Sequence, residues 1–277
     1  MPPNPLYSDM GSGVFCVHAF DESFCQPYMH AHMQYEFLFV IQGSILVENS
    51  KQTVTSKPPC VIIHCPYTLH RAQTTDQHSG IYERYVINFK ENLLSDFSEY
   101  IDLSRLKSFG MTQIPLAEQT SKFLKACCEQ IIEANSNSNR KRSILILAVI
   151  ADTLVKCMVQ SESVHSASKL MYIHQVMEFI AETLQLNLTL EAIAERFFVS
   201  RAKLVADFKA VTGISIKKYA TLMKLNMAKI MLQNGHSVSN TAQACGFCND
   251  SHFIVAFKKH TNMTPKEYAR QINLGLG

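Results

Sequence analysis

The feature of this sequence that most constrains its fold is an internal repeat in the last third of the chain. Phe208-Lys209, Gly213 and Tyr219 recur 49 residues later as Phe257-Lys258, Asn262 and Tyr268. Upstream of these residues the offset falls to 48, which pairs Ala194 with Ala242. Because a repeat of this kind indicates one supersecondary unit built twice, we expect two similar structural units here.

Each copy has the pattern of two helices joined by a tight turn. In the first copy, apolar spacing predicts a helix over residues 190–197 and a second helix from the N-cap Ser200 to Gly213. In the second copy, Gly246 makes the turn and Asn249 or Asp250 caps the next helix. The small Ala194 and Ala242 let paired helices cross closely. This pattern is typical of a helix-turn-helix unit, whose second helix fits the major groove of DNA, and a protein-binding helical repeat is the alternative.

The charge of the chain is distributed unevenly. Residues 1–165 hold 13 Lys and Arg against 16 Asp and Glu, whereas residues 166–277 hold 13 against 7. A basic half suggests a polyanion partner, although chance clustering of surface lysines gives the same count. Together with the repeat, the charge favours double-stranded DNA as the partner.

Residues from about 170 to 271 resemble the DNA-binding domain of the AraC/XylS family of transcription regulators. The residues that carry the resemblance are Gly246-Phe247, Phe253, Phe257-Lys258-Lys259 and Thr264-Pro265-x-x-Tyr268. The resemblance implies two helix-turn-helix units held by a long central helix over residues 216–234, with recognition helices ~34 Å apart on DNA. The chain departs from the family pattern at Phe198, Thr241 and Asn262, where the family usually has a small residue, Ile and Gly.

The resemblance also implies which residues contact DNA. The base-reading positions are Arg201, Ala202, Val205, Ala206, Asn249, Asp250, Ser251 and Val255. The phosphate contacts are Ser200, Lys203, Lys209, Lys258 and Lys259. Alanine and valine donate no hydrogen bond to guanine but pack on a thymine methyl group. We therefore hypothesise a binding site rich in A·T, with affinity supplied by phosphate contacts.

The first part of the chain has the pattern of β structure followed by helices. Between residues 14 and 89, short segments rich in β-branched and aromatic residues (35–41, 44–48, 61–64 and 85–89) are separated by turn residues, which predicts a sandwich or barrel. Helical spacing then predicts a hairpin of two helices joined by the polar loop 135–142. Ile146 and Val149 on the outer side of the second helix indicate either packing on the β domain or a dimer interface.

A group of histidines lies within the β segment. His30, His32, Glu36 and Gly43 have the spacing of the first cupin motif, and His70 follows Pro66 where the second motif ends. Residues 14–89 thus resemble a cupin, a fold that also serves as sensor domain in AraC/XylS regulators. On one strand His30, His32 and Glu36 share a parity, so their side chains point into the same interior. With His70 they suit a divalent metal such as Zn, Fe, Mn or Ni.

Alternative interpretations of these side chains stay open. They bind a metal, or they shape a pocket that requires no cofactor. We expect a small-molecule effector bound by His30, His32, Glu36, His70 and Arg84, and this mixture favours a small polar ligand such as a sugar. If side chains fill the interior, the domain is only a dimerisation scaffold. A metal-dependent cupin enzyme fused to a DNA-binding module is a further alternative.

The remaining features concern setting and chemistry. The nine cysteines, an odd number, are expected to be reduced thiols. The chain shows no basic region followed by an apolar leader, and its longest apolar run, residues 144–151, is far below the ~20 residues that cross a bilayer. We therefore expect a cytoplasmic protein without membrane contact. Because no GxSxG motif or Gly-rich phosphate loop is present, we expect no enzyme activity.

These expectations combine into an α+β multidomain regulator. Residues 1–115 form a cupin-like β-barrel or jelly roll that senses an effector, and residues 116–162 form the helical hairpin. Residues 163–169 are a linker, and residues 170–277 form an all-α domain with two helix-turn-helix units. The expected partners are double-stranded DNA, the effector, a second copy of the chain in a homodimer, and RNA polymerase. Effector binding would change subunit pairing or the contacts of the DNA-binding domain.

Overall fold

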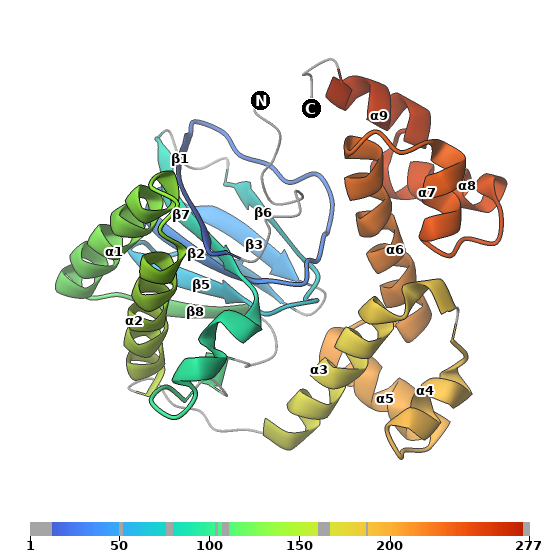
Figure 1. Cartoon of the computed structure of the whole chain (residues 1–277), viewed down its shortest axis with the longest axis horizontal. Coiled ribbons are helices and arrows are strands. Elements are labelled where there is room, and N and C mark those ends of the chain that lie inside the picture. The colour runs from blue at the N-terminus through green and yellow to red at the C-terminus, as the bar shows by residue number, and fades with distance from the viewer. Residues whose placement is uncertain are drawn as a thin grey trace. The chain divides into compact units, whose positions relative to one another are not determined.

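The chain divides into two compact units, each described by itself. The computed structural model describes residues 13–49, 52–75, 80–102, 105–106, 111–159, 167–186 and 188–273. Among these, the first unit ends at Met171 and the second begins at Tyr172. Figure 1 shows strands and then two helices in the first unit, and helices alone in the second. Helix α3 (Ala167–Glu182) begins inside the segment predicted as a linker.

The first unit is built on two antiparallel sheets. The order of the first sheet is β1-β7-β2-β5-β8, and that of the second is β4-β3-β6. The strands are β1 (Phe15–Asp21), β2 (Tyr35–Gln42), β3 (Ile45–Asn49), β4 (Thr53–Thr55), β5 (Cys60–His64), β6 (His70–Thr74), β7 (Tyr82–Phe89) and β8 (Met111–Pro115), with the 3₁₀ helix η2 (Glu91–Phe97) after β7. The predicted cupin-like β domain is thus confirmed, and β8 extends it beyond the predicted strands.

Strand β2 contributes side chains to both faces of the larger sheet. Phe37 and Phe39 belong to the buried cluster that also contains residues of the two helices after the strands. Glu36, Leu38 and Val40 alternate with them and point to the opposite face, because successive side chains of a strand alternate. All five are buried, so the strand has a core on each side.

Two antiparallel helices, α1 (Glu118–Ser136) and α2 (Arg140–Val159), cover one face of the larger sheet (Figure 1). Leu124 of α1 and Leu154 of α2 are buried in one cluster with Phe37, which confirms that the hairpin packs on the β domain. The predicted loop 135–142 was too long. The helix continues past Asn135, whose side-chain amide donates to the carbonyl of Val14 at 2.9 Å, so this polar residue serves as an anchor.

The second unit repeats a short helix, a turn and a longer helix. Its elements after α3 are η4 (Leu184–Leu186), α4 (Leu190–Arg196), α5 (Arg201–Thr212), α6 (Ile216–Gln233), α7 (Val238–Ala244), α8 (Asp250–Thr261) and α9 (Pro265–Asn273). Leu204 and Phe208 of α5 are buried, as are Phe253 and Phe257 of α8. Within the described ranges of the chain, no helix is both long and apolar enough to cross a membrane.

Local capping explains where the two longer helices begin and end. The Ser200 hydroxyl accepts from the backbone N–H of Lys203 at 3.2 Å, and the Asn249 side chain accepts from that of His252 at 2.8 Å. The cap of α8 is therefore Asn249. Both helices end at a left-handed residue, Gly213 (φ 76°) and Asn262 (φ 57°), so Asn262 fills the glycine position of the second copy.

Candidate functional site

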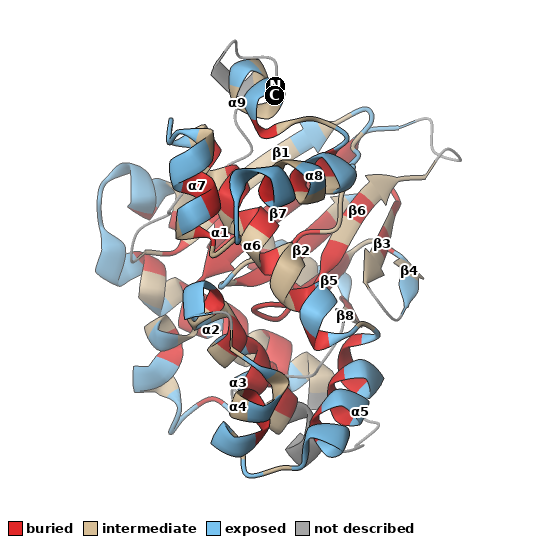
Figure 2. Cartoon of the chain, turned by 90° about the vertical axis from the view of Figure 1, so that its right-hand side faces the viewer, coloured by how far each residue is buried: buried red, intermediate tan, exposed pale blue. Residues whose placement is uncertain are grey.

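The outward sides of α5 and α8 carry the residues predicted to contact DNA. In Figure 2, exposed residues alternate with buried ones along both helices. On α5, the predicted contact residues that are exposed are Arg201, Ala202, Lys203, Val205, Ala206 and Lys209. On α8 and its cap, they are Asn249, Asp250, Ser251, Val255, Lys258 and Lys259. Val255 is 68% exposed.

Two of the predicted DNA-contacting cations have acidic neighbours in the protein. Lys203 Nζ lies 2.6 Å from the Asp207 carboxylate one turn later on α5, and Arg201 lies 3.1 Å from Glu191 of α4. Lys209, Lys258 and Lys259 extend the basic character of the two helices. Phe198 lies in the turn before α5 with φ 54° and is 94% exposed.

A second group of functional side chains lies in the interior of the β domain. Glu36 of β2 is paired in register with His64 of β5 on one side and with Asn88 of β7 on the other. The three side chains therefore form a row across the sheet. His70 joins the group from β6 of the smaller sheet, and His30 forms an isolated bridge with it through two backbone hydrogen bonds of 2.9 Å.

The imidazoles of this group face the Glu36 carboxylate. His32 Nε2 lies 3.6 Å from it, His70 Nε2 3.7 Å and His64 Nε2 3.9 Å, which is too long for hydrogen bonds. The Nδ1 atoms of His32 and His70 each lie 2.8 Å from a carbonyl oxygen, that of Gln34 and of Thr68. A carbonyl only accepts, so Nδ1 of each ring carries a proton, and Nε2 offers a lone pair when the ring is neutral.

Several of these buried polar atoms lack a hydrogen-bond partner within the part of the chain that the structure describes. They are Glu36 Oε2, His32 Nε2, both ring nitrogens of His64, His70 Nε2, and both side-chain atoms of Asn88. A buried polar atom that makes no hydrogen bond destabilises the fold by roughly 1–3 kcal/mol. Such a concentration on one interior row is the signature of a site for a polar ligand or an ion.

Burial and mutual charge set the protonation of the group. Burial raises the pKa of Glu36, but the surrounding histidines His32, His64 and His30 outweigh this effect and lower the pKa to about 2. Burial lowers the pKa of His64 to about 4 against the opposing effect of Glu36, and it lowers that of His70 well below its ordinary value. At neutral pH the Glu36 carboxylate thus lies beside the neutral imidazoles of His64 and His70, which are the forms that bind metal ions or accept hydrogen bonds.

The structure brings together most of the predicted interior residues. His30, His32, Glu36 and His70 converge, whereas Arg84 lies apart from them. Arg84 is opposite Val40, four residues from Glu36 along β2 and so roughly 13 Å away. It pairs with Asp21 at 2.5 Å and lies between the rings of Phe24 and Tyr82.

Sequence reasoning missed His64 and Asn88, which complete the row with Glu36. Asn88 has the parity of Arg84 on the predicted strand, so alternation alone indicated that it faces the interior. His64 ends a predicted strand and shares the parity of Ile62. Neither signal shows which strands are neighbours.

Comparison with known proteins agrees with this architecture. The sequence matches the AraC-like ligand binding domain over residues 13–150 and a helix-turn-helix domain over residues 193–271. LumQ of Photobacterium leiognathi, a probable transcriptional regulator, is 23% identical over 257 residues, which are 92% of this chain and 95% of LumQ. The transcriptional activator RhaS of Salmonella schwarzengrund is 30% identical over 96 residues, and the match spans only 34% of RhaS.

The fold as a whole resembles that of ToxT from Vibrio cholerae. The structure of ToxT bound to (E)-4-(8-methylnaphthalen-1-yl)but-3-enoic acid has a TM-score of 0.64 at 13% identity and covers 94% of this chain and 99% of ToxT. The two domain matches together span most of the sequence. The chain belongs to the AraC/XylS family of transcription regulators, with an N-terminal ligand-binding domain and a C-terminal helix-turn-helix DNA-binding domain.

Proposed function

We propose that this regulator reads DNA chiefly through apolar contacts and phosphates, under the control of a small polar ligand in the β domain. The observation that carries the DNA half is the composition of the exposed faces, where Ala202, Val205, Ala206 and Val255 take positions that face outward. Such side chains distinguish bases by contact with the thymine methyl group. DNA as the partner also supports the expectation of a cytoplasmic protein.

Selection of binding sites from random duplexes tests the DNA half. We expect selected sites with A·T pairs at the positions under α5 and α8. The Val205→Arg variant should then favour guanine at one position, because Arg binds guanine O6 and N7 in a bidentate manner. Sites rich in G·C at their central positions would contradict the proposal.

The ligand half is supported by the buried polar row. Glu36, His64 and Asn88 together offer an anionic acceptor, ring nitrogens and an amide, all facing one interior. A small molecule with several hydroxyl groups, such as a sugar, matches these groups because each hydroxyl both donates and accepts. That the matched relatives are named as regulators supports a sensing role rather than a catalytic one.

Thermal shift of the full chain against sugars, sugar acids and polyols tests the ligand half. We expect at least one such compound to raise the melting temperature of the wild type and to have no effect on Asn88→Leu. The control is Asn135→Leu, which makes the same change at an exposed asparagine of α1, outside the interior row. If the whole panel leaves the wild type unchanged, the interior is a scaffold.

A divalent metal is a second candidate occupant, favoured by His64. Two sets of ligand atoms, His30/His32/His70 and Glu36/His64/His70, each lie within 4.8 Å of one another. Ligands of a tetrahedral zinc lie roughly 3.4 Å apart, so a small contraction would suffice. Gln34 O and Thr68 O already orient His32 and His70, as carbonyl groups do behind metal-bound imidazoles. A bound ion would polarise a ligand oxygen held beside Glu36.

Elemental analysis of protein purified without a polyhistidine tag tests the metal. We expect about one equivalent of Zn, Ni, Fe or Mn, with the affinity reduced at least roughly tenfold in His64→Ala. His18→Ala, on β1 and bonded to Glu83, is the control and should bind as the wild type does. Equal metal content in both variants would remove the proposal.

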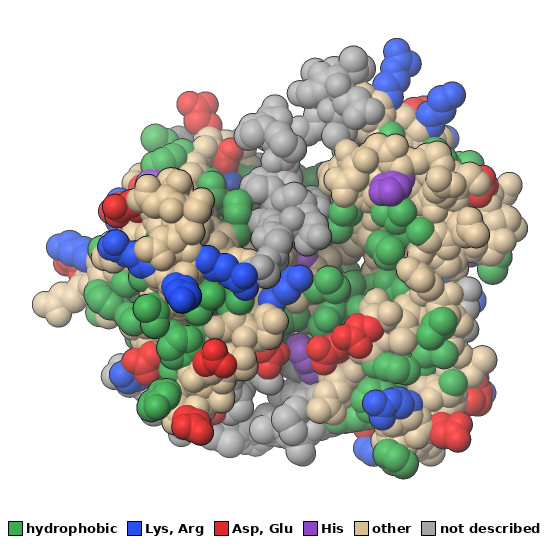
Figure 3. Space-filling model, viewed as in Figure 1, with side chains coloured by type: hydrophobic (Ala, Val, Ile, Leu, Met, Phe, Trp, Pro, Cys, Tyr) green, Lys and Arg blue, Asp and Glu red, His purple; other side chains and the backbone are tan. Residues whose placement is uncertain are grey.

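We further propose that the outer face of the hairpin pairs two copies of the chain. Leu145 and Val149 of α2 are 58% and 46% exposed, and Phe123 of α1 is 46% exposed. Figure 3 shows hydrophobic side chains at the surface over these helices. Leu145→Glu should turn a dimer into a monomer in sedimentation analysis, and a wild-type monomer would refute the pairing. We also propose that the DNA-bound protein acts on RNA polymerase. Transcription of a reporter gene in vitro, with and without the protein, tests this.

A further inference from the structure

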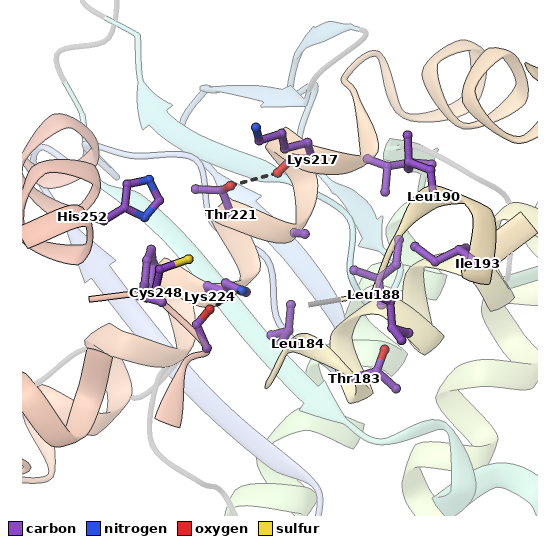
Figure 4. A pocket seen from close by; sticks show the side chains of 15 residues that line it. Thr183, Leu184, Leu188, Leu190, Ile193, Lys217, Thr221, Lys224, Cys248 and His252 are labelled. Atoms are coloured by element: carbon purple, nitrogen blue, oxygen red, sulfur yellow. Dashed lines mark hydrogen bonds between the residues drawn. The ribbon is translucent and has the colours of Figure 1, made fainter. Parts of the chain in front are cut away.

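A cavity lies at the junction between the two helix-turn-helix units of the second domain. Its volume is about 380 Å³, within the range of small-molecule sites. In Figure 4, Leu188, Leu190 and Ile193, at the first helix-turn-helix unit, lie on one side of the cavity. Cys248 and His252, of the second helix-turn-helix unit, lie on the other side. The first half of α6 runs between them. A molecule in this cavity would therefore contact both units at once.

The lining combines an apolar body with a basic edge. Leu184, Leu188, Ile193 and Phe247 are among the apolar members. The charged members are Lys217 and Lys224 of α6, and no Asp or Glu is among the described residues that line the cavity. Thr183 and Thr221 already donate their hydroxyl groups to the carbonyls of Phe179 and Lys217, and His252 adds an imidazole ring. This combination suits a ligand with an apolar body and a single anionic group.

Lys224 is held in place at the centre of the cavity wall. Its Nζ atom donates to the carbonyl of Gly246 at 2.7 Å and lies 5.7 Å from the centre of the Phe247 ring. The ammonium group carries three N–H donors in all. Burial lowers the pKa of Lys224 because part of its hydration is lost.

The two units meet closely beside the cavity. A Cβ atom on Gly246 would lie 2.9 Å from the Leu184 carbonyl oxygen and 3.0 Å from the Gln185 Cα atom. The turn of the second unit thus rests directly on η4 of the first. The cavity is the space left next to this contact, so its occupant would lie where the separation of α5 and α8 is determined.

We propose that this junction cavity binds a small amphipathic carboxylate, with the carboxylate at Lys224 and the apolar body against Leu184, Leu188 and Ile193. The site is separate from the interior of the β domain and independent of what binds there. It would give the DNA-binding domain a ligand of its own.

Protection of a thiol locates the ligand. Cys248 lines the cavity and is exposed, and Cys25 is an exposed thiol of the β domain. In the full chain, octanoate below its micellar concentration should slow alkylation of Cys248 by iodoacetamide about fivefold or more and leave Cys25 unchanged, as mass spectrometry of the peptides would measure. Octanol, which has the same chain and no charge, should protect far less, because it lacks the charge-assisted contact.

Two variants and one control complete the test. Lys224→Met removes the ammonium group, and Ala220→Phe, one turn earlier on α6, places a phenyl ring in the cavity, so both should abolish the protection. Lys218→Met removes an exposed lysine of the same helix outside the cavity and should retain it. Circular dichroism shows whether each variant is folded. If Lys224→Met does not fold, the result for Ala220→Phe tests the proposal. No protection of the wild type, equal protection by octanol, or protection that persists in folded Ala220→Phe would overturn the proposal.

Discussion

In the second helix-turn-helix unit, Nζ of Lys229 lies 3.3 Å from Nε2 of His260. Lys229 belongs to α6 and is 3% exposed, and His260 belongs to the last turn of α8. Burial lowers the pKa of Lys229 to about 8. Burial, and then the charge of Lys229, lowers the pKa of His260 to about 4. The fold therefore favours a neutral imidazole at this contact.

The stability of this part of the domain should begin to fall with falling pH before the pH at which carboxylates usually titrate is reached. Between pH 6.5 and about 4, His260 is protonated in the unfolded chain and neutral in the folded one, so stability falls as the pH falls through this window. We expect a loss of about 1–3 kcal/mol, read from hydrogen exchange of α8 amides at pH 7 and pH 5. His260→Gln should flatten the dependence, whereas His236→Gln, at an exposed site, should not. An unchanged slope in His260→Gln would contradict this assignment.

Removing the charge of Lys229 should raise the pKa of His260. In Lys229→Met, the pKa of His260 should rise toward its ordinary value without reaching it, because burial, the larger cause, remains. NMR titration of labelled imidazole rings measures this shift, and His236 in the same spectra is the internal reference. If the His260 titration stays where it is in the wild type, the two groups do not interact.

Two glycines with similar backbone angles should differ in their tolerance of alanine. Gly246 (φ 68°) faces the Leu184 carbonyl, whereas Gly235 (φ 82°) has nothing within 4 Å of the added Cβ. Gly235→Ala should cost about 1 kcal/mol, from the left-handed conformation alone. Gly246→Ala should cost about 2 kcal/mol or more because η4 must also move. Urea unfolding followed by circular dichroism compares them, and equal losses would show that the junction yields freely.

The lysines of α8 should contribute affinity without sequence preference. Lys258→Ala and Lys259→Ala should each weaken binding of every duplex by a similar factor and reduce the slope of log K against log salt by about 1. Lys122→Ala, on α1 and paired with Glu118, is the control and should leave the slope unchanged. A loss confined to one DNA sequence would assign these lysines to base reading.

The helical half of the fold was predictable because its rules are local. Ser200 and Asn249 cap the helices that follow them, and Gly213 and Asn262 end them, all within a few residues of sequence. The register of the β domain is not local. That Glu36 lies between His64 and Asn88 depends on which strands pair, and alternation gives only the face of a residue. For the same reason Arg84 was assigned to the right face but to the wrong depth, since its partner Asp21 belongs to β1, which is far away in sequence but pairs with the Arg84 strand.

Strand β2 has an evolutionary consequence that follows from its two faces. Glu36 and Leu38 point to the interior face of the sheet, where Glu36 forms the polar row with His64 and Asn88. Phe37 and Phe39 point to the face covered by the helices. Substitution at one of these positions alters one layer alone, so ligand preference and hairpin packing can diversify separately. Insertion of a single residue would instead exchange the two sets, setting the Glu36 carboxylate against α1 and α2 and a phenyl ring among the histidines. The strand should therefore accept many changes of residue and almost none of length, and new ligand specificities should arise through substitution on its even-numbered positions.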